Sequence, residues 1–420
     1  MAILTPFPLI HGGRGFFLEA MKMKKFFLSG VLAALLLGLV PFVSAKVKIG
    51  GIVFTDFYYL DRNGANAEFN GVGDGPYTVT TIQVPDITRL YATWTNEDNV
   101  GMYIELGIGQ EDGEIDRNQS NGVNLRHAYG WWDVTPGFRL MAGKSTTPFS
   151  PLNPSQLLGT RSGSLNIVGV GYGNFYSGRF AQIRGTYQFC KNARVALALV
   201  DPNGSARYIG TNGPWSDFGI TTQNNTKIPR IDISLPVFFG PVSLYPSFMY
   251  QHRTVDANGA AGGSVDNDLN SYIGSLGFKF GMGPLMLSGE GNWGRNWGNT
   301  RGLIGNSVPA IISSAMLDPF NNQIDDADTY SYWFDLSYGF GAVTPHVIFG
   351  EMSTRNKYLG LDLDAKSRMW GFSVPIDLSK GFRIRPEVMW YDDGELKVQN
   401  VGDLDMGKYA IYGVQFQVTF

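Results

Sequence analysis

The chain has 420 residues and a net charge of −3, and its charged residues make up 16%, below the ~25% of ordinary soluble domains. One apolar segment near the N-terminus is too short for a membrane-spanning helix, and no later run reaches the ~20 apolar residues that such a helix needs. A helical membrane protein is therefore excluded. The negative net charge argues against nucleic acid as a partner. The single Cys190 excludes an internal disulfide and a cysteine-rich metal site, and no pattern indicates a cofactor.

Residues 1–45 combine an upstream extension with the features of a secretory signal peptide. Met21-Lys-Met-Lys-Lys25 is basic, Phe26–Val40 is apolar, and Val43-Ser-Ala45 supplies the small residues that signal peptidase accepts. The apolar run is too short for a membrane anchor. Residues 1–20 fit neither the signal nor the segments that follow, so the mature chain is expected to begin at Lys46.

From Lys46 the sequence falls into paired segments of alternating apolar and polar residues, joined in turn by short and long connections. Val79–Asn96, for example, ends at the tight turn Glu97-Asp-Asn99, whereas a long loop follows Gly298. About 16 such segments, with short turns on one side and long loops on the other, are typical of a bacterial outer-membrane barrel. Residues 46–420 are therefore predicted to form an all-β fold, one transmembrane antiparallel β-barrel of about 16 strands.

The last stretch, Lys408–Phe420, shows the alternation most clearly. One face is apolar: Ala410, Tyr412, Val414, Phe416, Val418 and Phe420. The other face suits water except at Ile411. Here the chain resembles bacterial outer-membrane β-barrel proteins, whose final strand ends in Phe. That resemblance implies an outer-membrane location in a Gram-negative bacterium and makes Phe420 the signal read by the barrel-assembly machinery.

Alternation also assigns the two faces of the other strands. Outward positions that should meet lipid are Leu90, Ala92, Trp94, Met102, Ile104, Leu106, Ile108, Tyr330, Tyr332, Phe334, Leu336, Tyr338 and Phe340. Aromatic pairs near strand ends, such as Trp131-Trp132, would form interfacial girdles. Because a charge facing mid-bilayer lipid costs ~2–4 kcal/mol, charged strand residues are predicted to line a wet pore: Arg89, Glu105, Arg126, Arg139, Arg184, Arg230, Asp232, Lys279, Glu290, Asp335, Arg383, Arg385 and Glu387.

The segment Gly143-Lys-Ser-Thr-Thr-Pro148-Phe149 resembles the opening of the third loop in trimeric porins, especially phosphate-selective-type ones. The resemblance implies that residues 146–176 fold into the barrel as a constriction loop, with Pro148, Phe149 and Arg161 in that loop. It also implies a homotrimer. An external cap over the barrel mouth is the alternative arrangement. No run of closely spaced inward lysines and arginines supports a dedicated phosphate binder.

Other motifs carry little weight. Gly289–Gly294 matches a dinucleotide-binding pattern but lies inside a predicted strand. His127, His252 and His346 stand on separate strands without a catalytic pattern, so the chain is not expected to be an enzyme. Asp325, Asp326 and Asp328 could hold Ca²⁺, but a solvated acidic loop is the simpler interpretation, and no metal site is predicted.

The sequence favours a porin that passes small hydrophilic solutes and ions by passive diffusion, in contact with outer-membrane lipid and lipopolysaccharide. Barrels of 16 to 18 strands leave an aqueous lumen. A solute-selective anion- or phosphate-type channel and a structural or adhesive barrel are the alternatives. An outer-membrane lipid hydrolase would need a nucleophile and a base on adjacent outward positions, and the sequence offers none.

Signal peptidase is expected to cut after Ala45, because the apolar run and the small residues place the site there. N-terminal sequencing of the protein extracted from outer membranes should then begin at Lys46. A first residue upstream of Phe26 would contradict the signal-peptide interpretation.

Overall fold

A computed structural model describes residues 46–420, except residues 72, 74, 86, 110–121, 160–167, 203–221, 259–263, 301–306, 319–322 and 359. The predicted signal peptide lies outside the described residues. Residues 46–420 form a closed antiparallel barrel of 16 strands, as the alternation predicted. None of the helices in the described residues is long and apolar enough to cross a membrane.

Twelve barrel strands are continuous and four positions around the barrel are built from two or three shorter pieces. The continuous strands are β1 (Lys46–Arg62), β4 (Val100–Gly109), β5 (Gly122–Thr135), β6 (Phe138–Thr146), β7 (Arg179–Cys190), β8 (Ala193–Val200), β12 (Val242–Asn258), β13 (Ser264–Met282), β14 (Leu285–Arg295), β17 (Asp328–Tyr338), β18 (His346–Tyr358) and β24 (Lys408–Thr419). The shorter pieces are β2 (Tyr77–Gln83), β3 (Arg89–Thr95), β9 (Thr222–Asn225), β10 (Arg230–Ser234), β11 (Val237–Phe239), β19 (Leu361–Ser373), β20 (Ile376–Ser379), β21 (Phe382–Asp392), β22 (Glu395–Val398) and β23 (Gly402–Asp405).

The pieces β2–β3, β9–β11, β19–β20 and β21–β22 each fill one barrel position, and β23 pairs with β22.

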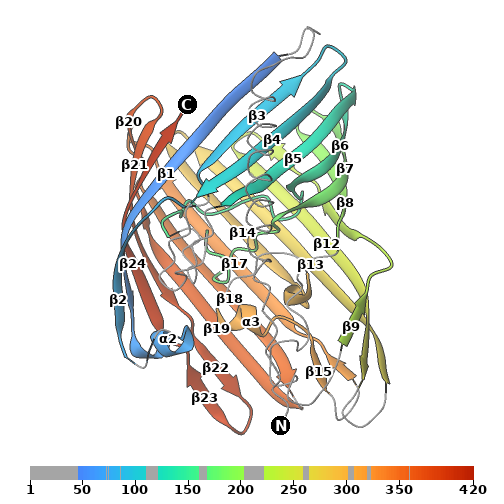
Figure 1. Cartoon of the computed structure of the whole chain (residues 1–420), viewed down its shortest axis with the longest axis vertical. Helices are drawn as coiled ribbons and strands as arrows, with labels where there is room; N and C mark the ends of the chain where they lie inside the picture. The colour runs from blue at the N-terminus through green and yellow to red at the C-terminus, as the bar shows by residue number, and fades with distance from the viewer. Residues whose placement is uncertain are drawn as a thin grey trace, which may run out of the picture. The chain divides into compact units, whose positions relative to one another are not determined.

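The long loops at one end carry the remaining elements. These are the helix α2 (Gly64–Phe69), the short helices η2 (Trp297–Asn299) and α3 (Val308–Ile311), and the hairpin of β15 (Met316–Asp318) and β16 (Gln323–Asp325). Figure 1 shows the C-terminus and the β20–β21 turn at one end of the barrel, and α2, β9, β15 and the β22–β23 hairpin at the other. The short and long connections are thus sorted to opposite ends.

The barrel closes between its first and last strands. β1 pairs with β24 in antiparallel register from Ile52 opposite Thr419 to Arg62 opposite Tyr409. Closure leaves no sheet edge with unpaired backbone groups, which is the condition for a sheet to exist in lipid.

One predicted strand is interrupted. The segment Val79–Asn96 is not continuous, because β2 ends at Gln83 and β3 begins at Arg89. Pro85 has no backbone N–H to offer a neighbouring strand. Nearby, the Thr88 hydroxyl takes the place of a backbone partner: its Oγ1 accepts from Phe54 N at 3.0 Å.

The predicted outward face is confirmed by exposure. Large apolar side chains on it are open to the surroundings: Leu90, Met102, Ile108, Tyr330, Phe334, Leu336, Tyr338, Phe340, Tyr412, Phe416 and Val418. Of the pair Trp131-Trp132, only Trp132 belongs to this face, because successive strand residues point to opposite sides. The apolar band therefore follows from the pleat alone.

The inner face is apolar along part of its circumference. Trp333, Ile348, Met369, Met389 and Ile411 point inward from β17, β18, β19, β21 and β24 and form one buried cluster. Ile411, the exception on the polar face of the last strand, is 1% exposed in this cluster. An apolar inner wall requires a covering segment inside the barrel, because bare apolar surface in a wet lumen is unfavourable.

Deleting Phe420 is expected to lower the yield of folded barrel more than the stability of what folds. Phe420 exchanges two backbone hydrogen bonds with Gly51, of 3.1 and 3.2 Å, and its ring is 66% exposed. Heat-modifiable mobility of outer-membrane extracts measures the yield, and Phe340→Ala, at another exposed outward ring, is the matched control. If the deletion variant folded with the yield of the wild type, Phe420 would not be the assembly signal.

Candidate functional site

The segment between β6 and β7 is described over residues 147–159 and 168–178, which are mostly buried. Leu152, Leu158 and Tyr172 join the apolar cluster on the inner wall. Phe149 meets Phe175 edge to face at 5.5 Å in a second cluster. These contacts cover the apolar inner wall of the barrel, and we call the two described stretches the internal loop.

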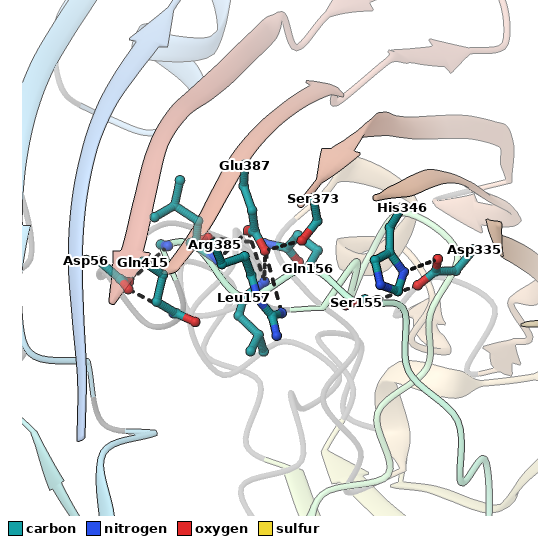
Figure 2. Close-up of polar contacts among 12 residues, drawn as sticks. Asp56, Ser155, Gln156, Leu157, Asp335, His346, Ser373, Arg385, Glu387 and Gln415 are labelled. Carbon is teal, nitrogen blue, oxygen red and sulfur yellow. Dashed lines mark hydrogen bonds and ion pairs between the residues drawn. The ribbon is translucent and has the colours of Figure 1, made fainter. Parts of the chain in front are cut away.

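Glu387 on β21 holds the middle of this internal loop. Its Oε2 accepts hydrogen bonds from the backbone nitrogens of Leu157, at 3.1 Å, and Leu158, at 2.7 Å. Its Oε1 accepts from the Ser373 hydroxyl at 2.8 Å (Figure 2). The carboxylate thereby satisfies backbone donors that would otherwise be buried without partners, at a cost of ~1–3 kcal/mol each.

Two further carboxylates repeat this arrangement. Asp335 on β17 accepts from Ser155 N at 2.7 Å and pairs with His346 Nδ1 at 2.7 Å. Asp56 on β1 accepts from Gly159 N at 3.3 Å and from Gln415 Nε2 at 2.8 Å (Figure 2). Carboxylates on separate strands therefore accept hydrogen bonds from the main chain of the loop.

The start of the loop is fixed in the same way. The Ser150 hydroxyl donates to Glu290 on β14, and Ser150 N donates to Ser247 Oγ at 3.2 Å.

Gly143, the first residue of the porin-like motif, has a φ of +127°, and a Cβ there would stand 2.4 Å from the carbonyl oxygen of Ala128. Only glycine fits both the angle and the close approach. Gly143 therefore lies inside β6, which ends at Thr146 within the same motif.

The far part of the loop is tied to the long-loop end of the barrel. The Tyr172 hydroxyl donates to Asp393, which also accepts from Asn66 Nδ2 at 2.6 Å. Asn66 belongs to α2, and its Oδ1 accepts from Arg62 Nη1 at 2.5 Å. Internal loop, first external loop and barrel wall are therefore joined by one polar network.

A second segment, residues 296–316 without the undescribed 301–306, also folds inward. Trp297 meets Phe175 of the internal loop edge to face at 5.4 Å, and Ser307 Oγ donates to Gly171 O at 2.5 Å. Asn356 of β18 donates to the carbonyl oxygens of Ile312, at 2.6 Å, and Ser314, at 2.7 Å. The sequence indicated only a long loop here, and it lies over the same wall as the internal loop.

Eight predicted pore-lining residues are nearly closed to water, with at most 7% of each residue exposed. Glu105 and Arg126 form a pair on β4 and β5, and the other six are Arg230, Asp232, Glu290, Asp335, Arg385 and Glu387. Arg230 Nη2 meets Asp232 Oδ2 at 2.7 Å, and Arg385 Nη1 lies 3.7 Å from Glu387 Oε1. The expectation that these charges lie in open water is wrong, because the internal loop and their mutual pairing cover them.

The opposite wall, β3–β8, carries the other predicted charges. Arg126 Nε meets Glu105 Oε1 at 2.7 Å, and Tyr103 donates to Glu105 Oε2 at 2.6 Å. The β4–β5 register shifts at this point, so Arg126 and His127 are successive residues that both reach inner-face partners. Arg89 is half-buried beside this pair.

The remaining predicted residues lie nearer the short turns. Arg139 pairs with Asp133 at 2.6 Å and Arg383 with Asp377 at 2.7 Å. Arg184 donates to the carbonyl oxygen of Thr146 at 3.3 Å, and Lys279 is exposed. In the proposed constriction set, Pro148 and Phe149 are buried, and Arg161 lies outside the described residues.

Arg179 is an inward-turned residue that the strand alternation did not predict. Its Nε donates to His127 Nε2 at 3.0 Å, and His127 Nδ1 lies 3.3 Å from Ser145 Oγ. Since Nε2 accepts, the imidazole is the neutral Nδ1–H tautomer. Alternation along β7 assigns Arg179 to the outer face with Ile183, and only its position at the first residue of the strand lets it turn inward.

The acidic residues considered for Ca²⁺ have protein partners instead. Arg295 Nη1 meets Asp326 Oδ2 at 2.9 Å, and Arg295 Nε meets Asp328 Oδ1 at 3.0 Å. No group of three or more potential metal ligands occurs within the described residues. These carboxylates therefore stabilise the loop end through arginine.

Glu387→Ala is expected to loosen the internal loop. The change leaves Arg385 buried without its carboxylate, at a cost of ~3–5 kcal/mol. The expected result is a lower unfolding temperature of the purified barrel and noisier open-channel current. Glu395→Ala, at an exposed carboxylate on β22, is the control. Unchanged noise and stability in Glu387→Ala would show that the carboxylate does not hold the loop.

No protein-family model and no curated protein sequence matches the chain. Among solved structures, it is similar to the outer membrane channel DcaP of Acinetobacter baumannii, with 15% identity, a TM-score of 0.65 and coverage of 91% of this chain and 99% of that one.

Two further similar structures have lower scores. An anion-selective porin from Comamonas acidovorans has 15% identity and a TM-score of 0.55, covering 90% of this chain and 100% of its own. The trimer form of OmpT, an outer membrane protein of Vibrio cholerae, has 11% identity and a TM-score of 0.51, covering 90% and 99%. The chain therefore has the 16-stranded barrel fold that these outer-membrane proteins share.

Proposed function

We propose that the protein is a porin of the Gram-negative outer membrane that lets small hydrophilic solutes and ions diffuse through a water-filled lumen. The observation that carries the proposal is the asymmetry of that lumen. The internal loop and the segment 296–316 cover the wall formed by β17–β24, which leaves the wall of β3–β8 to line the path. Residues 146–176 would then form the constriction.

The charges of this wall favour anions. Its inward-facing described residues include Arg89, Arg126, Arg139, Arg179, Arg184 and Arg194, against the carboxylates Glu105 and Asp133. The acidic residues that would offset this excess are buried under the internal loop. Since the field in a wet lumen is screened over ~8–10 Å at physiological salt, the excess should tilt ion selectivity rather than enforce it.

The proposed surroundings follow from the fold. The exposed apolar band would contact outer-membrane lipid and lipopolysaccharide, and Phe420 would be read by the barrel-assembly machinery. A homotrimer is proposed by analogy with the trimer form of OmpT. No catalytic role, cofactor or nucleic-acid partner is proposed. A structural or adhesive barrel is the rival function, and it predicts no conductance.

Planar bilayers under a KCl gradient test the proposal. The purified protein should form open channels whose reversal potential indicates a mild preference for chloride. Arg89→Gln and Arg179→Gln should each move the reversal potential toward potassium, because each removes a positive charge from the open wall.

Arg295→Gln is the matched control, since Arg295 lies on the outer face and pairs with Asp326 and Asp328. It should leave the reversal potential unchanged. Absence of conductance by a heat-modifiable, folded barrel would refute the porin function, and an unaltered potential in both wall variants would refute the role of the arginines.

A further inference from the structure

The open wall carries a continuous row of aromatic side chains. Tyr91, Tyr103, Tyr129 and Trp131 all point inward, because they alternate with the outward residues of β3, β4 and β5. Successive ring centroids lie 6.0, 5.6 and 5.9 Å apart from Tyr91 to Trp131. The four side chains are only partly buried. We call this row the aromatic platform.

Glycines on the neighbouring strands let the rings of the platform lie against the wall. Gly50 is paired with Tyr91, and a Cβ on Gly50 would stand 2.5 Å from the tyrosine hydroxyl. Gly101 is paired with Trp131, and a Cβ there would stand 2.2 Å from the indole ring. Each of these rings thus covers the backbone of a neighbouring strand. Tyr91 is partly exposed toward the lumen, whereas the Arg139 guanidinium lies over the Trp131 ring, 5.2 Å from its centroid.

Further guanidinium groups stand at the end of the platform away from Arg139. Arg89 and Arg179 are both half-buried, and both lie within electrostatic range of Glu105 and Arg126. Glu105 is the carboxylate of this group, and it is already bonded to Arg126 Nε and to the Tyr103 hydroxyl. Among the described residues the positive charge of this end is therefore only partly compensated.

From this juxtaposition we propose that the platform and the arginines at its end bind aromatic carboxylates, and that the channel selects these solutes from other small anions. A flat ring stacks on tyrosine and tryptophan faces, while its carboxylate meets guanidinium groups that prefer planar anions. An aliphatic carboxylate gains only the ionic contact, and a neutral sugar only the stacking. The inference rests on the porin function and adds its substrate class.

Block of the KCl current by added solute tests the assignment. Benzoate and cyclohexanecarboxylate are matched in charge and ring size, and only benzoate is aromatic. Benzoate should halve the current at a concentration ~3–10-fold lower than cyclohexanecarboxylate, the range that one or two aromatic contacts supply. Arg89→Gln should weaken block by both carboxylates alike.

Variants of the platform separate the ring from its hydroxyl group. Tyr103→Leu and Tyr129→Leu should abolish the preference for benzoate, whereas Tyr103→Phe keeps the ring and should retain it. Tyr330→Leu, on the outer face, is the control for loss of a tyrosine. Heat-modifiable mobility confirms that each variant folds, and equilibrium dialysis of benzoate against the purified barrel measures binding without conductance.

The outcomes distinguish this inference from the porin function. Equal block by the two carboxylates in a conducting wild-type channel would overturn the substrate class alone, as would an unchanged benzoate preference in the two leucine variants. Stronger block by glucose than by benzoate would assign the platform to neutral sugars instead. A folded barrel that does not conduct would refute the porin function, and dialysis would still decide whether it binds benzoate.

Discussion

The lumen depends on the hydrogen bonds that inward-pointing carboxylates accept from the main chain of the internal loop. Asp56, Asp335 and Glu387 stand on separate strands, and each accepts from a backbone nitrogen of the loop. A buried N–H without a partner costs ~1–3 kcal/mol. These hydrogen bonds therefore allow a long, irregular segment to be buried inside a barrel whose own backbone groups are already paired.

Apolar contacts also hold the internal loop against the wall of the barrel. A polar inner wall would leave the loop free to move into the lumen, whereas Ile348, Met369 and Met389 give Leu158 and Tyr172 an apolar surface to cover. The wall beneath the loop is consequently built like a protein core, and the wall across from it like a wet surface. One barrel thus has two kinds of inner face.

This asymmetry sets the chemistry of the path. Burial removes Glu290, Asp335 and Glu387 from the water of the lumen, while Arg89 and Arg179 stay partly exposed on the other side. A chain of negative net charge can in this way present a positive lumen. The aromatic platform lies on the same open wall as the arginines, so a solute that follows the charges also meets the rings.

The barrel and its outer face could be predicted from the amino-acid sequence, because the period of two is a local property of an extended chain. Large exposed side chains of β17 and β24, among them Phe334, Phe416 and Val418, follow this period. The resemblance of residues 143–149 to the opening of a porin loop also indicated where β6 ends, at Thr146. The sequence could not say which inward charges meet water. Glu387 is buried by Leu158, 229 residues away, and Arg179, which alternation assigns to the outer face, turns inward from the end of its strand to meet His127. Both outcomes depend on which distant segments meet inside the closed barrel, and no local stretch of sequence contains that information.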